Sequence, residues 1–566
     1  MSELHDALPK PFLTVMQDLL GGEYNAFIES YRDTTRRGLR FNLLKAPGRQ
    51  SRQGLISALS SSHNCHSYDS HQTPPGSDNT VLDSLYPPLT PVPWCSEGYQ
   101  YPANHRPAKS ILYNAGLFYI QEPSAMCPAA ILAPKPGQRV LDLCAAPGGK
   151  SVQLAGYMQG QGLLVANDAS PSRSRALVKN LEMSGVTNAM VFTEMPHRIA
   201  ARFEGFFDCI LVDAPCSGEG MFRRDFDAAK AYTANKPEAC AVMQREILHH
   251  AARMLRPGGR MVYSTCTFNP LENEGSVSAF LAAHPDFELL PIDHEGLGLS
   301  RGRGDGCGKA AELFNLNNTA RIWPHLAPGE GHFIALMARK GGESSVAKDT
   351  SSPEYAAGVE PACNSQSGYN TDISPTIGTA AFPDFKKGRK LPEEFLTFCR
   401  EALHVPVSPR EASMGAAADT AINKGASYTT ASIPCTTDSI FVWDNHSRDE
   451  KYPVQRLYLQ PASLDIKGLR VARSGWLLGE FSKGYFTPSQ ALAMGITKAQ
   501  ARYSVDLSEA EAWRYLKGES ISLPEDFAST AGKPWVLICY MGYPLGWARL
   551  VQGRLKNQLP SGWVVT

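Results

Sequence analysis

Five short apolar runs alternate with segments of helical character between residues 110 and 340. Apolar runs of this length are typical of parallel strands that are buried on both faces of a sheet. Strands that alternate with helices along the chain predict an α/β fold with a doubly wound, Rossmann-like sheet. The five runs cover residues 139–143, 163–166, 189–192, 209–212 and 260–263.

Two of the intervening helices carry clear end signals. Ser170 followed by Pro171 is a typical helix start, because serine caps free amides and proline fits the first helical position. Gly185 then marks the end of this helix, since glycine readily takes the left-handed conformation that closes one. A second helix should end before residues 255–259, where a proline and two glycines force a turn into the next strand.

The length and charge of the chain limit its class. A chain of 566 residues is too long for one ordinary core, so we expect several domains. Basic and acidic residues number 55 each, so any RNA-binding surface must be a local patch. No stretch resembles a signal peptide or a membrane span. The 13 cysteines include no Cys-x-x-Cys pair, which favours reduced thiols. We therefore expect a cytoplasmic protein that binds no metal.

Changes in composition divide the chain into four parts. The strand–helix repeat is followed by a linker rich in Ser, Thr, Gly and Pro, with a short helix near residues 391–403. Short strand-like runs separated by glycine turns predict a small, mostly β domain at the C-terminal end. The four expected parts are residues 1–109, 110–341, 342–434 and 435–566.

The first part contains a stretch at residues 57–75 that is rich in Ser, His and Pro and has no periodicity. This composition predicts a loop insert. Metal binding is the alternative, but ligands need a rigid frame with supporting hydrogen bonds, and so polar a segment offers none. The residues in question are His63, Cys65, His66 and His71.

The loop from Asp142 to Lys150 is the first candidate site. It follows a predicted strand and precedes a predicted helix, and Gly148 and Gly149 allow a tight turn close to a ligand. In an open α/β sheet this position binds a nucleotide-like ligand. Asp168, at the end of the next strand, can accept hydrogen bonds from ribose hydroxyls. The loop lacks both the Gly-x-Gly-x-x-Gly of a dinucleotide site and the spacing of a Walker loop.

Two cysteines are expected at the same edge of the sheet. Cys216 lies in Asp213-Ala-Pro-Cys-Ser-Gly218 after the fourth strand, and Cys266 lies in Ser264-Thr-Cys-Thr267 after the fifth. A single buried cysteine is usually inert. However, the carboxyl ends of neighbouring parallel strands meet at one edge, so we expect the two thiols to lie close together. A disulfide is the alternative, and a reducing cytosol disfavours it.

These motifs, in this order, resemble the NOL/NOP/Sun family of RNA cytosine-5 methyltransferases. The resemblance runs from Tyr113 to Lys340 and includes residues 116–125 and 329–333. The block from residue 8 to residue 42 is similar to the substrate-binding module of the bacterial branch that modifies small-subunit ribosomal RNA. Residues 542–547 and 555–557 are similar to that branch's PUA-related RNA-binding domain.

The resemblance implies a mechanism that uses S-adenosylmethionine and a covalent adduct. Cys266 would be the nucleophile, Cys216 would assist product release by β-elimination, and Asp213 would hold the polar edge of the base. Lys150 would lower a thiol pKa electrostatically. Glu194 is a candidate on the adenosine side, with a solvated surface carboxylate as the alternative. The cofactor contacts implied are Cys144, Ala145, Ala146, Pro147, Gly148, Gly149, Lys150, Asp168, Glu194 and Asp213.

The expected substrate is a cytidine held out of any base stack, and the resemblance implies that it lies in 16S ribosomal RNA. Arg36, Arg37, Arg40 and Tyr113 are candidates to hold the RNA backbone or stack on its bases. The rival readings are a transfer-RNA or DNA cytosine methyltransferase and a non-catalytic ribosome-assembly factor. We expect a monomer whose C-terminal domain adds RNA affinity, and an α/β core that closes without residues 435–566.

Overall fold

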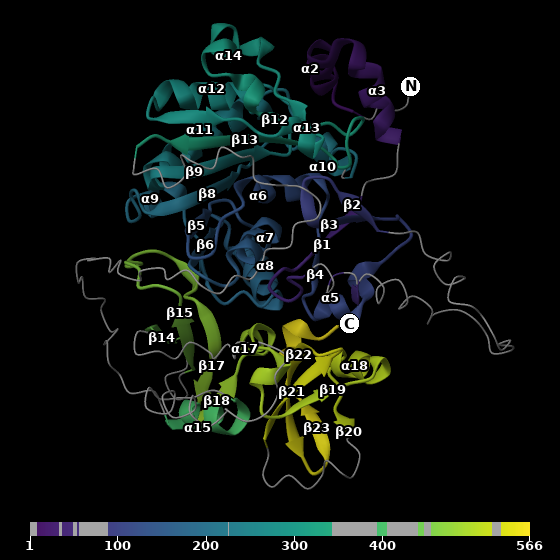
Figure 1. Ribbon diagram of the computed structural model, residues 1–566, viewed down its shortest axis with the longest axis vertical. Coiled ribbons are helices and arrows are strands. Elements are labelled where there is room, and N and C mark those ends of the chain that lie inside the picture. Colours follow the sequence, from purple (N-terminus) through teal and green to yellow (C-terminus); the bar gives the residue numbers. More distant parts are fainter. Residues whose placement is uncertain are drawn as a thin grey trace, which may run out of the picture.

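The computed structural model describes residues 8–32, 37–48, 52, 54–55, 89–224, 226–341, 393–404, 440–445, 454–522 and 534–565. An α/β body carries the N-terminal helices at its side, and two strand-rich parts lie beneath it (Figure 1). The expected 57–75 insert with its candidate ligands, Arg36 and most of the 342–434 linker lie outside the described residues.

The centre of the fold is a ten-stranded sheet with five adjacent parallel strands in the order β9-β8-β5-β6-β7. All five predicted runs coincide with these strands, apart from Leu143, which follows β5, so the doubly wound topology is confirmed. Strand β9 begins at Leu255 rather than at residue 260, because Leu255 pairs with Phe207. The strands are β5 (Arg139–Asp142), β6 (Leu163–Asn167), β7 (Ala189–Phe192), β8 (Phe207–Asp213) and β9 (Leu255–Thr265).

Four antiparallel strands extend the sheet beyond β9. Strand β13 pairs with β9 and β12, β12 pairs with β11, and β10 pairs with β13. They are β10 (Phe287–Leu290), β11 (Ser300–Arg301), β12 (Ala320–Ile322) and β13 (His332–Arg339).

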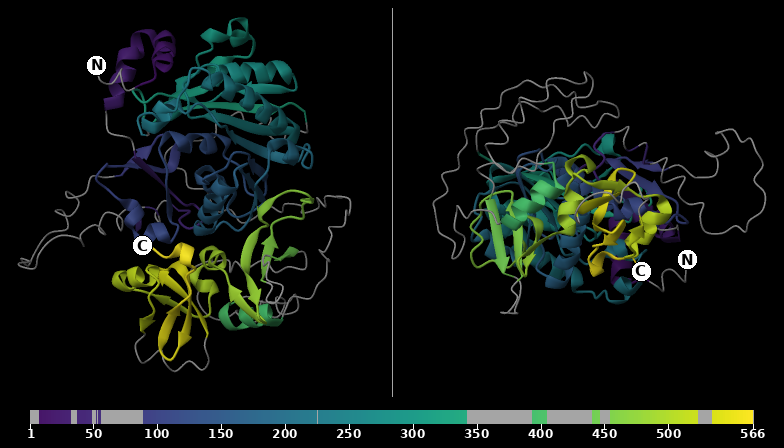
Figure 2. Two further views of the ribbon diagram at one scale, coloured as in Figure 1. Left: turned by 180° about the vertical axis from the view of Figure 1, so that it is seen from behind. Right: turned by 90° about the horizontal axis from the view of Figure 1, so that it is seen from below.

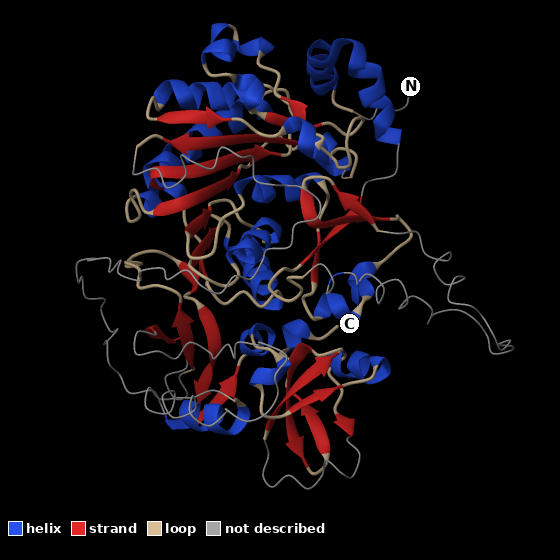
Figure 3. Cartoon of the chain, viewed as in Figure 1, coloured by secondary structure: helices blue, strands red, loops and turns tan. Residues whose placement is uncertain are grey.

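Helices cover both faces of this sheet (Figure 3). Val140 of β5 packs in the core under α6, α7 and α8, whereas its neighbour Leu141 packs under α9, α11 and α12. Alternate residues of one strand thus bury against opposite helical layers, which explains the uninterrupted apolar runs. The helices are α6 (Cys127–Leu132), α7 (Gly149–Met158), α8 (Pro171–Met183), α9 (Pro196–Ala200), α11 (Lys236–Met254) and α12 (Glu274–Ala283).

The predicted helix ends are confirmed. Helix α8 has Ser170 at its N-cap and Pro171 at its first position, and Gly185 follows its end with a φ of +72°. The hydroxyl of Ser170 contacts that of Ser172 at 3.0 Å and caps no backbone amide. Helix α11 ends at Met254 as predicted, and the proline–glycine segment lies in the irregular first part of β9, where the pairing register shifts.

The N-terminal region contributes two helices and a four-stranded sheet to the same body. Helices α2 (Lys10–Leu20) and α3 (Tyr24–Glu29) pack on aromatic rings of the α/β part, with the ring of Phe27 at 5.2 Å from that of Phe268. The sheet takes its last strand from beyond the expected boundary at residue 109, so the two parts share one continuous core. Its order is β2 (Thr90–Val92), β3 (Cys95–Tyr101), β1 (Arg37–Phe41) and β4 (Phe118–Ile120).

The C-terminal region, expected as one small β domain, holds two sheets that lie side by side (Figure 2). The helix expected near 391–403 is α15 (Glu393–Ala402), and it packs on Phe486 of the first sheet. Two short helices, α17 (Gln490–Gly495) and α18 (Glu509–Leu516), accompany the sheets. The first sheet consists of β14 (Ile440–Asn445), β15 (Gln455–Gln460), β17 (Trp476–Ser482) and β18 (Tyr485–Pro488). The second consists of β19 (Ser504–Asp506), β21 (Trp535–Tyr540), β22 (Tyr543–Val551), β23 (Arg554–Asn557) and β20 (Ile521–Ser522).

One C-terminal strand belongs to the α/β sheet itself. Strand β16 (Val471–Arg473) pairs antiparallel with β7 and so forms the edge of the central sheet. The buried guanidinium of Arg473 donates to the carbonyl oxygen of Val186 at 2.8 Å. Residues 435–566 therefore supply an edge strand of the α/β sheet, a contact that the sequence analysis did not predict.

Within the described ranges, no helix has both the length and the apolar character needed to cross a membrane. Among the same residues, no three His, Cys, Asp or Glu side chains gather as metal ligands would.

Candidate active site at the carboxyl edge of the sheet

Acidic side chains and a thiol follow the carboxyl ends of the five parallel strands. Asp142 ends β5 and Asp213 ends β8, Asp168 and Glu194 follow β6 and β7, and Cys266 follows β9. Because these ends share one edge of the sheet, the predicted site residues converge there.

The loop between β5 and α7 is fixed by contacts from several elements. Gly148 has a φ of +114°, which glycine adopts without strain, and α7 begins at the next residue. The amide of Ala145 donates to the carbonyl oxygen of Asn167 at 2.7 Å. Arg40 reaches the loop from β1 and donates to the carbonyl oxygen of Gly149 at 2.7 Å. These bonds place the loop rigidly above the sheet edge.

Side chains of α8 hold the middle of this loop. Arg173 donates to the carbonyl oxygen of Ala146 at 2.7 Å, and Asn180 donates to that of Pro147 at 2.8 Å. Burial raises the pKa of the Cys144 thiol well above its usual value. Cys144 is therefore a neutral group that lines the loop.

Asp142 and Asp168 place carboxylate oxygens beneath the loop. One oxygen of the fully buried Asp142 accepts from the hydroxyl of Ser151 at 2.6 Å, and the other has no hydrogen-bond partner among the described residues. Burial raises the pKa of Asp142 to about 7, against the opposing effect of Ser151. Asp168 accepts from the amides of Ala146 at 3.3 Å and Ser170 at 3.0 Å.

Glu194 is neither exposed nor open to a ligand on its carboxylate. Its side chain is 0% exposed and lies 3.1 Å from Arg198 and 3.5 Å from Arg470. It also accepts from the backbone amide of Arg470 at 2.7 Å. The carboxylate therefore joins β7 to the C-terminal region, and the surface alternative is wrong.

Asp213 is the centre of a charged group at the end of β8. It lies 2.8 Å from the amine of Lys150, accepts from the hydroxyl of Ser264 at 2.8 Å, and lies 3.6 Å from Nε2 of His332. Burial alone would raise the pKa of Asp213, but the charge of Lys150 and the contact with His332 lower it below its usual range. Asp213 is therefore an ionised carboxylate, and the amine of Lys150 points to it.

The two predicted cysteines meet beside this group. The sulfur atoms of Cys216 and Cys266 lie 3.3 Å apart, and both thiols are free. The hydrogen bond to Cys266, followed by burial, raises the pKa of Cys216 well above its usual value. Cys216 thus keeps its proton and can donate it to the sulfur of Cys266.

Glu272 was not predicted, and it holds the two thiol loops in place. It accepts from the amide of Ser217 at 2.9 Å, from the hydroxyl of the same serine, and from the side chain of Gln244 at 2.9 Å. The hydroxyls of Ser217 and Thr267 lie 2.7 Å apart, which joins the loops directly. The only signal in the sequence is an acidic residue in the turn that precedes an apolar helix.

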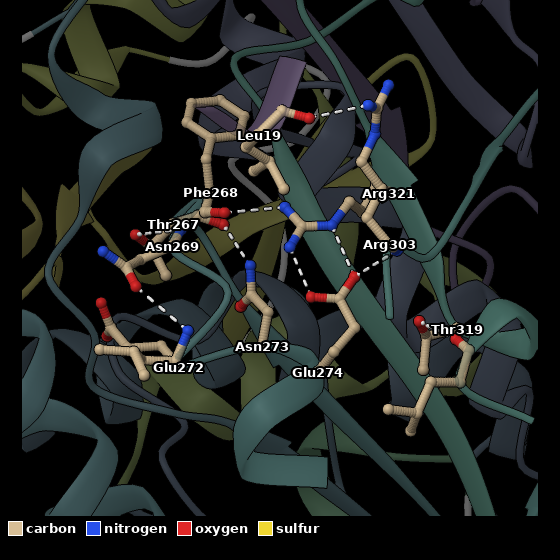
Figure 4. A network of polar contacts seen from close by, with 12 residues as sticks. Leu19, Thr267, Phe268, Asn269, Glu272, Asn273, Glu274, Arg303, Thr319 and Arg321 are labelled. Carbon is tan, nitrogen blue, oxygen red and sulfur yellow. Dashed lines mark hydrogen bonds and ion pairs between the residues drawn. The ribbon is translucent and has the colours of Figure 1, made fainter. Parts of the chain in front are cut away.

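A buried ion pair supports the segment that follows Cys266 (Figure 4). Arg321 pairs with Glu274 at 2.5 Å and donates to the carbonyl oxygen of Phe268 at 2.8 Å. Asn273 donates to the carbonyl oxygen of Thr267 at 3.0 Å. A paired charge in the interior fixes geometry even where it adds little stability.

Two of the candidate RNA contacts pack against other residues of the fold, and one of them is buried. Arg40 is 1% exposed and donates to Gln121 as well as to the carbonyl oxygen of Gly149, so its assignment to the RNA backbone is wrong. Tyr113 is half-buried, and its ring packs 5.9 Å from that of Phe118. Arg37 is half-exposed and stays a candidate.

The edge as a whole suits S-adenosylmethionine. Its amino group and ribose hydroxyls need hydrogen-bond acceptors, and its sulfonium favours nearby negative charge. The free oxygen of Asp142 and the carboxylate of Asp168 lie beneath a glycine turn and suit these needs. A doubly wound sheet with this edge defines an S-adenosylmethionine-dependent methyltransferase.

Comparisons with known proteins place the chain more narrowly. A family model described as 16S rRNA methyltransferase RsmB/F matches residues 129–338. Models of the RsmF N-terminal, first C-terminal and PUA domains match residues 70–123, 451–496 and 502–565. The last two divide the C-terminal region as its two sheets do.

Two relatives are each called ribosomal RNA small subunit methyltransferase F. That of Klebsiella pneumoniae is 31% identical over 83% of this chain and 84% of its own length. That of Erwinia tasmaniensis is 29% identical over 98% of this chain and 96% of its own length. The chain therefore belongs to the family of ribosomal RNA small subunit methyltransferase F, and the resemblance to the small-subunit branch is confirmed. A crystal structure of a Pyrococcus horikoshii methyltransferase homologue is 29% identical over 60% of this chain and 100% of its own, with a TM-score of 0.47.

Proposed function

We propose that this enzyme transfers a methyl group to carbon 5 of a cytidine in small-subunit ribosomal RNA. The observation that carries the proposal is the pair of free thiols, Cys216 and Cys266, beside the ionised Asp213. Carbon 5 of cytosine becomes nucleophilic only after a nucleophile adds to carbon 6. The reaction thus needs one group that attacks and another that completes release, whereas methylation of nitrogen or oxygen needs no thiol.

Cys266 is assigned as the attacking group. The raised pKa of Cys216 keeps its proton in place, and a hydrogen bond donated across the 3.3 Å between the two sulfur atoms would stabilise a negative charge on Cys266. The Cys266 thiolate forms a bond to carbon 6, and the electrons of the carbon 5–carbon 6 double bond become available at carbon 5 for the methyl group. Bound S-adenosylmethionine supplies that methyl group.

Cys216 is assigned to release. Once the sulfur of Cys266 is bonded to carbon 6, its negative charge is gone, and with it the main cause of the raised pKa of Cys216. Cys216 then loses its proton to solvent and takes the proton from carbon 5. The ring double bond re-forms, the sulfur–carbon bond breaks, and Cys266 leaves as a thiolate.

Asp213 is assigned to the polar edge of the base. An ionised carboxylate accepts a hydrogen bond from the exocyclic amino group of cytosine and stabilises a proton on the adjacent ring nitrogen. Ser264 and His332 orient this carboxylate, and Lys150 keeps it charged.

The cofactor is assigned to the loop of residues 144–150 and to Asp168, which would accept from the ribose. Both oxygens of Glu194 are held by arginines, so a supporting role fits this residue better than direct contact. Asp213 lies at the junction of the cofactor and base positions, because it contacts Lys150 of the loop and ends the strand before Cys216.

Two relatives carry the name of a ribosomal RNA small subunit methyltransferase, and the arrangement of this chain suits such a substrate. An N-terminal module, the methyltransferase domain and two C-terminal sheets each offer the RNA a surface, and several weak contacts in one chain suit a large structured target. We assign residues 1–109 to substrate binding, 110–341 to methyl transfer and 435–566 to RNA binding, in a monomer that acts in the cytoplasm.

The experiment is methyl transfer from labelled S-adenosylmethionine to isolated small subunits, protein-free 16S RNA and bulk transfer RNA, with the modified base mapped by bisulfite sequencing. We expect 5-methylcytidine in the 16S RNA of the first or second substrate. Methylation of transfer RNA alone would move the enzyme to the transfer-RNA branch. Cofactor binding without methylation of any RNA would favour a non-catalytic assembly factor.

A further inference from the structure

The positive charges of three arginines from two parts of the chain act on Tyr101, outside the catalytic residues. Arg37 begins β1 and lies directly opposite Tyr101 of β3 in the antiparallel ladder. Arg106 follows β3, and Arg224 follows the Cys216 loop of the methyltransferase domain. Arg106 and Arg224 are exposed, and Arg37 and Tyr101 are half-exposed. We call these four residues the arginine cluster.

The first two guanidinium groups are held side by side. Arg37 donates to the carbonyl oxygen of Ala103 at 2.9 Å, and Arg106 donates to the same oxygen at 2.6 Å. Two like charges on one oxygen repel each other, and only a neutral acceptor lies between them. An anion bound to both guanidinium groups would offset the repulsion between them.

The charge of the third arginine, Arg224, acts on the same tyrosine. Burial raises the pKa of Tyr101, while the positive charges of Arg37, Arg224 and Arg106 each act to lower it. Among the ion pairs of the described residues, none includes one of these three arginines. The chain as a whole has equal numbers of basic and acidic residues, so an unpaired group of three is a local positive patch.

The cluster lies close to both loops of the active site. Arg224 comes four residues after Gly220, whose amide donates to the carbonyl oxygen of Cys266 at 2.9 Å. Four residues span at most about 14 Å, so Arg224 lies within a few nucleotides of the attacking thiol. Arg40, three residues after Arg37 in β1, is bonded to the cofactor loop.

We propose that Arg37, Arg106 and Arg224 bind backbone phosphates of the RNA strand beside the target cytidine, and that Tyr101 stacks on an unpaired base there. The inference rests on the proposed function and adds the residues that position its substrate. The planar fork of arginine binds phosphate oxygens in pairs, and an aromatic face accepts any base. Because the enzyme has zero net charge, it has no overall positive field that attracts RNA, so local positive patches must provide the electrostatic attraction.

The test uses the full chain with Arg37, Arg106 and Arg224 all changed to Gln, and with Arg224→Gln alone. The matched control is Arg253→Gln, which removes one charge at the end of α11, on the opposite edge of the sheet. Binding of protein-free 16S RNA is measured at several salt concentrations, and methyl transfer is measured against RNA concentration. Binding of S-adenosylmethionine and the melting temperature are measured for every variant.

We expect the triple variant to have an RNA KM about tenfold higher or more. The slope of log Kd against log salt concentration should fall by about two, because each lost contact to a single-strand phosphate lowers it by about 0.7. Arg224→Gln should give a smaller change in the same direction, with kcat at saturating RNA and cofactor affinity near those of the wild type. An RNA KM and a salt slope equal to those of Arg253→Gln would overturn the inference. If the wild type binds 16S RNA and methylates no cytidine, the proposed function fails, and the salt slopes still decide whether the cluster binds phosphate.

Discussion

The sulfur atoms of Cys216 and Cys266 lie 3.3 Å apart, although 50 residues separate them along the chain. The residues that follow them, Ser217 and Thr267, are joined by a hydrogen bond of 2.7 Å between their hydroxyls. Two parallel strands bring the loops to one edge, and Glu272 fixes one loop against the other. The position of each thiol therefore depends on both loops.

Lys150→Met should slow methyl transfer by about 100-fold or more, because Asp213 loses the charge that keeps it ionised. In the wild type, Asp213 has a lower pKa in the folded protein than in the unfolded chain, so its ionised form stabilises the fold at any pH above its unfolded pKa. This contribution is lost only as the pH falls through the lower pKa that Asp213 has in the folded protein. The wild-type rate should therefore show no titration of Asp213 above pH 4, whereas the variant should lose its residual rate at acid pH. Lys150→Arg is the control and should keep the wild-type pH profile. Equal rates of Lys150→Met and the wild type would refute this role.

Asp142→Asn should flatten the dependence of stability on pH. Burial raises the pKa of Asp142 from 3.8 to about 7 in the folded protein. The contribution of Asp142 to stability is thus fully present below the pKa that this residue has in the unfolded chain, and it is lost as the pH rises to about 7. The loss amounts to about 1.4 kcal/mol for each unit by which the pKa is raised. Denaturant unfolding of the cofactor-free protein at pH 5 and pH 8 measures the slope.

The control for Asp142 is Asp208→Asn at the other end of the sheet. Burial would raise the pKa of Asp208, but hydrogen bonds from Arg139 and Arg256 lower it. This variant should lose stability at neutral pH and keep the wild-type decline between pH 5 and pH 8. If the stability of Asp142→Asn falls between pH 5 and pH 8 as much as that of the wild type, Asp142 is not the source of the decline.

Glu272→Ala should impair release more than attack. The change leaves the amide of Ser217 and the side chain of Gln244 without their buried acceptor, at a cost of about 2 kcal/mol or more. Because Glu272 holds the Cys216 loop, the covalent RNA adduct should form and then persist longer than in the wild type. Glu288→Ala, on the exposed side of β10, is the control and should change neither stability nor adduct lifetime. A stable Glu272→Ala enzyme with wild-type turnover would contradict the assignment.

Deletion of residues 342–566 should reduce cofactor affinity as well as RNA binding. The truncated sheet would expose the edge of β7, from which β16 has been removed, and would leave Glu194 without Arg470. We expect aggregation or a clear loss of S-adenosylmethionine binding in calorimetry. Arg470→Gln in the full chain keeps β16 in place and should bind cofactor normally. A soluble truncated protein with wild-type cofactor affinity would show that the edge strand is dispensable.

The parts of this molecule that are encoded locally were predictable. Each buried parallel strand is a continuous apolar run, and the ends of α8 are marked by Ser170, Pro171 and Gly185. The meeting of Cys216 with Cys266 followed from strand order, because adjacent parallel strands end at one edge.

The parts that depend on distant contacts were not predictable from local pattern. Nothing near Val471 or Arg473 indicates that their strand pairs with β7, which lies almost 280 residues earlier. The burial of Arg40 depends on its bond to the cofactor loop, and that of Glu194 depends on Arg470. From sequence alone a charged side chain is predicted to be exposed, because charged residues are rarely buried without a partner.

The covalent protein–RNA adduct tests the roles of Cys266 and Cys216 most directly. Cys266→Ala, Cys216→Ala and the control Cys240→Ala are incubated with labelled S-adenosylmethionine and 16S RNA or small subunits, and the products are separated on denaturing gels. We predict a protein–RNA band that accumulates with Cys216→Ala, no band and no methylation with Cys266→Ala, and wild-type turnover with Cys240→Ala. A band with Cys266→Ala and none with Cys216→Ala would contradict the assignment of the two thiols.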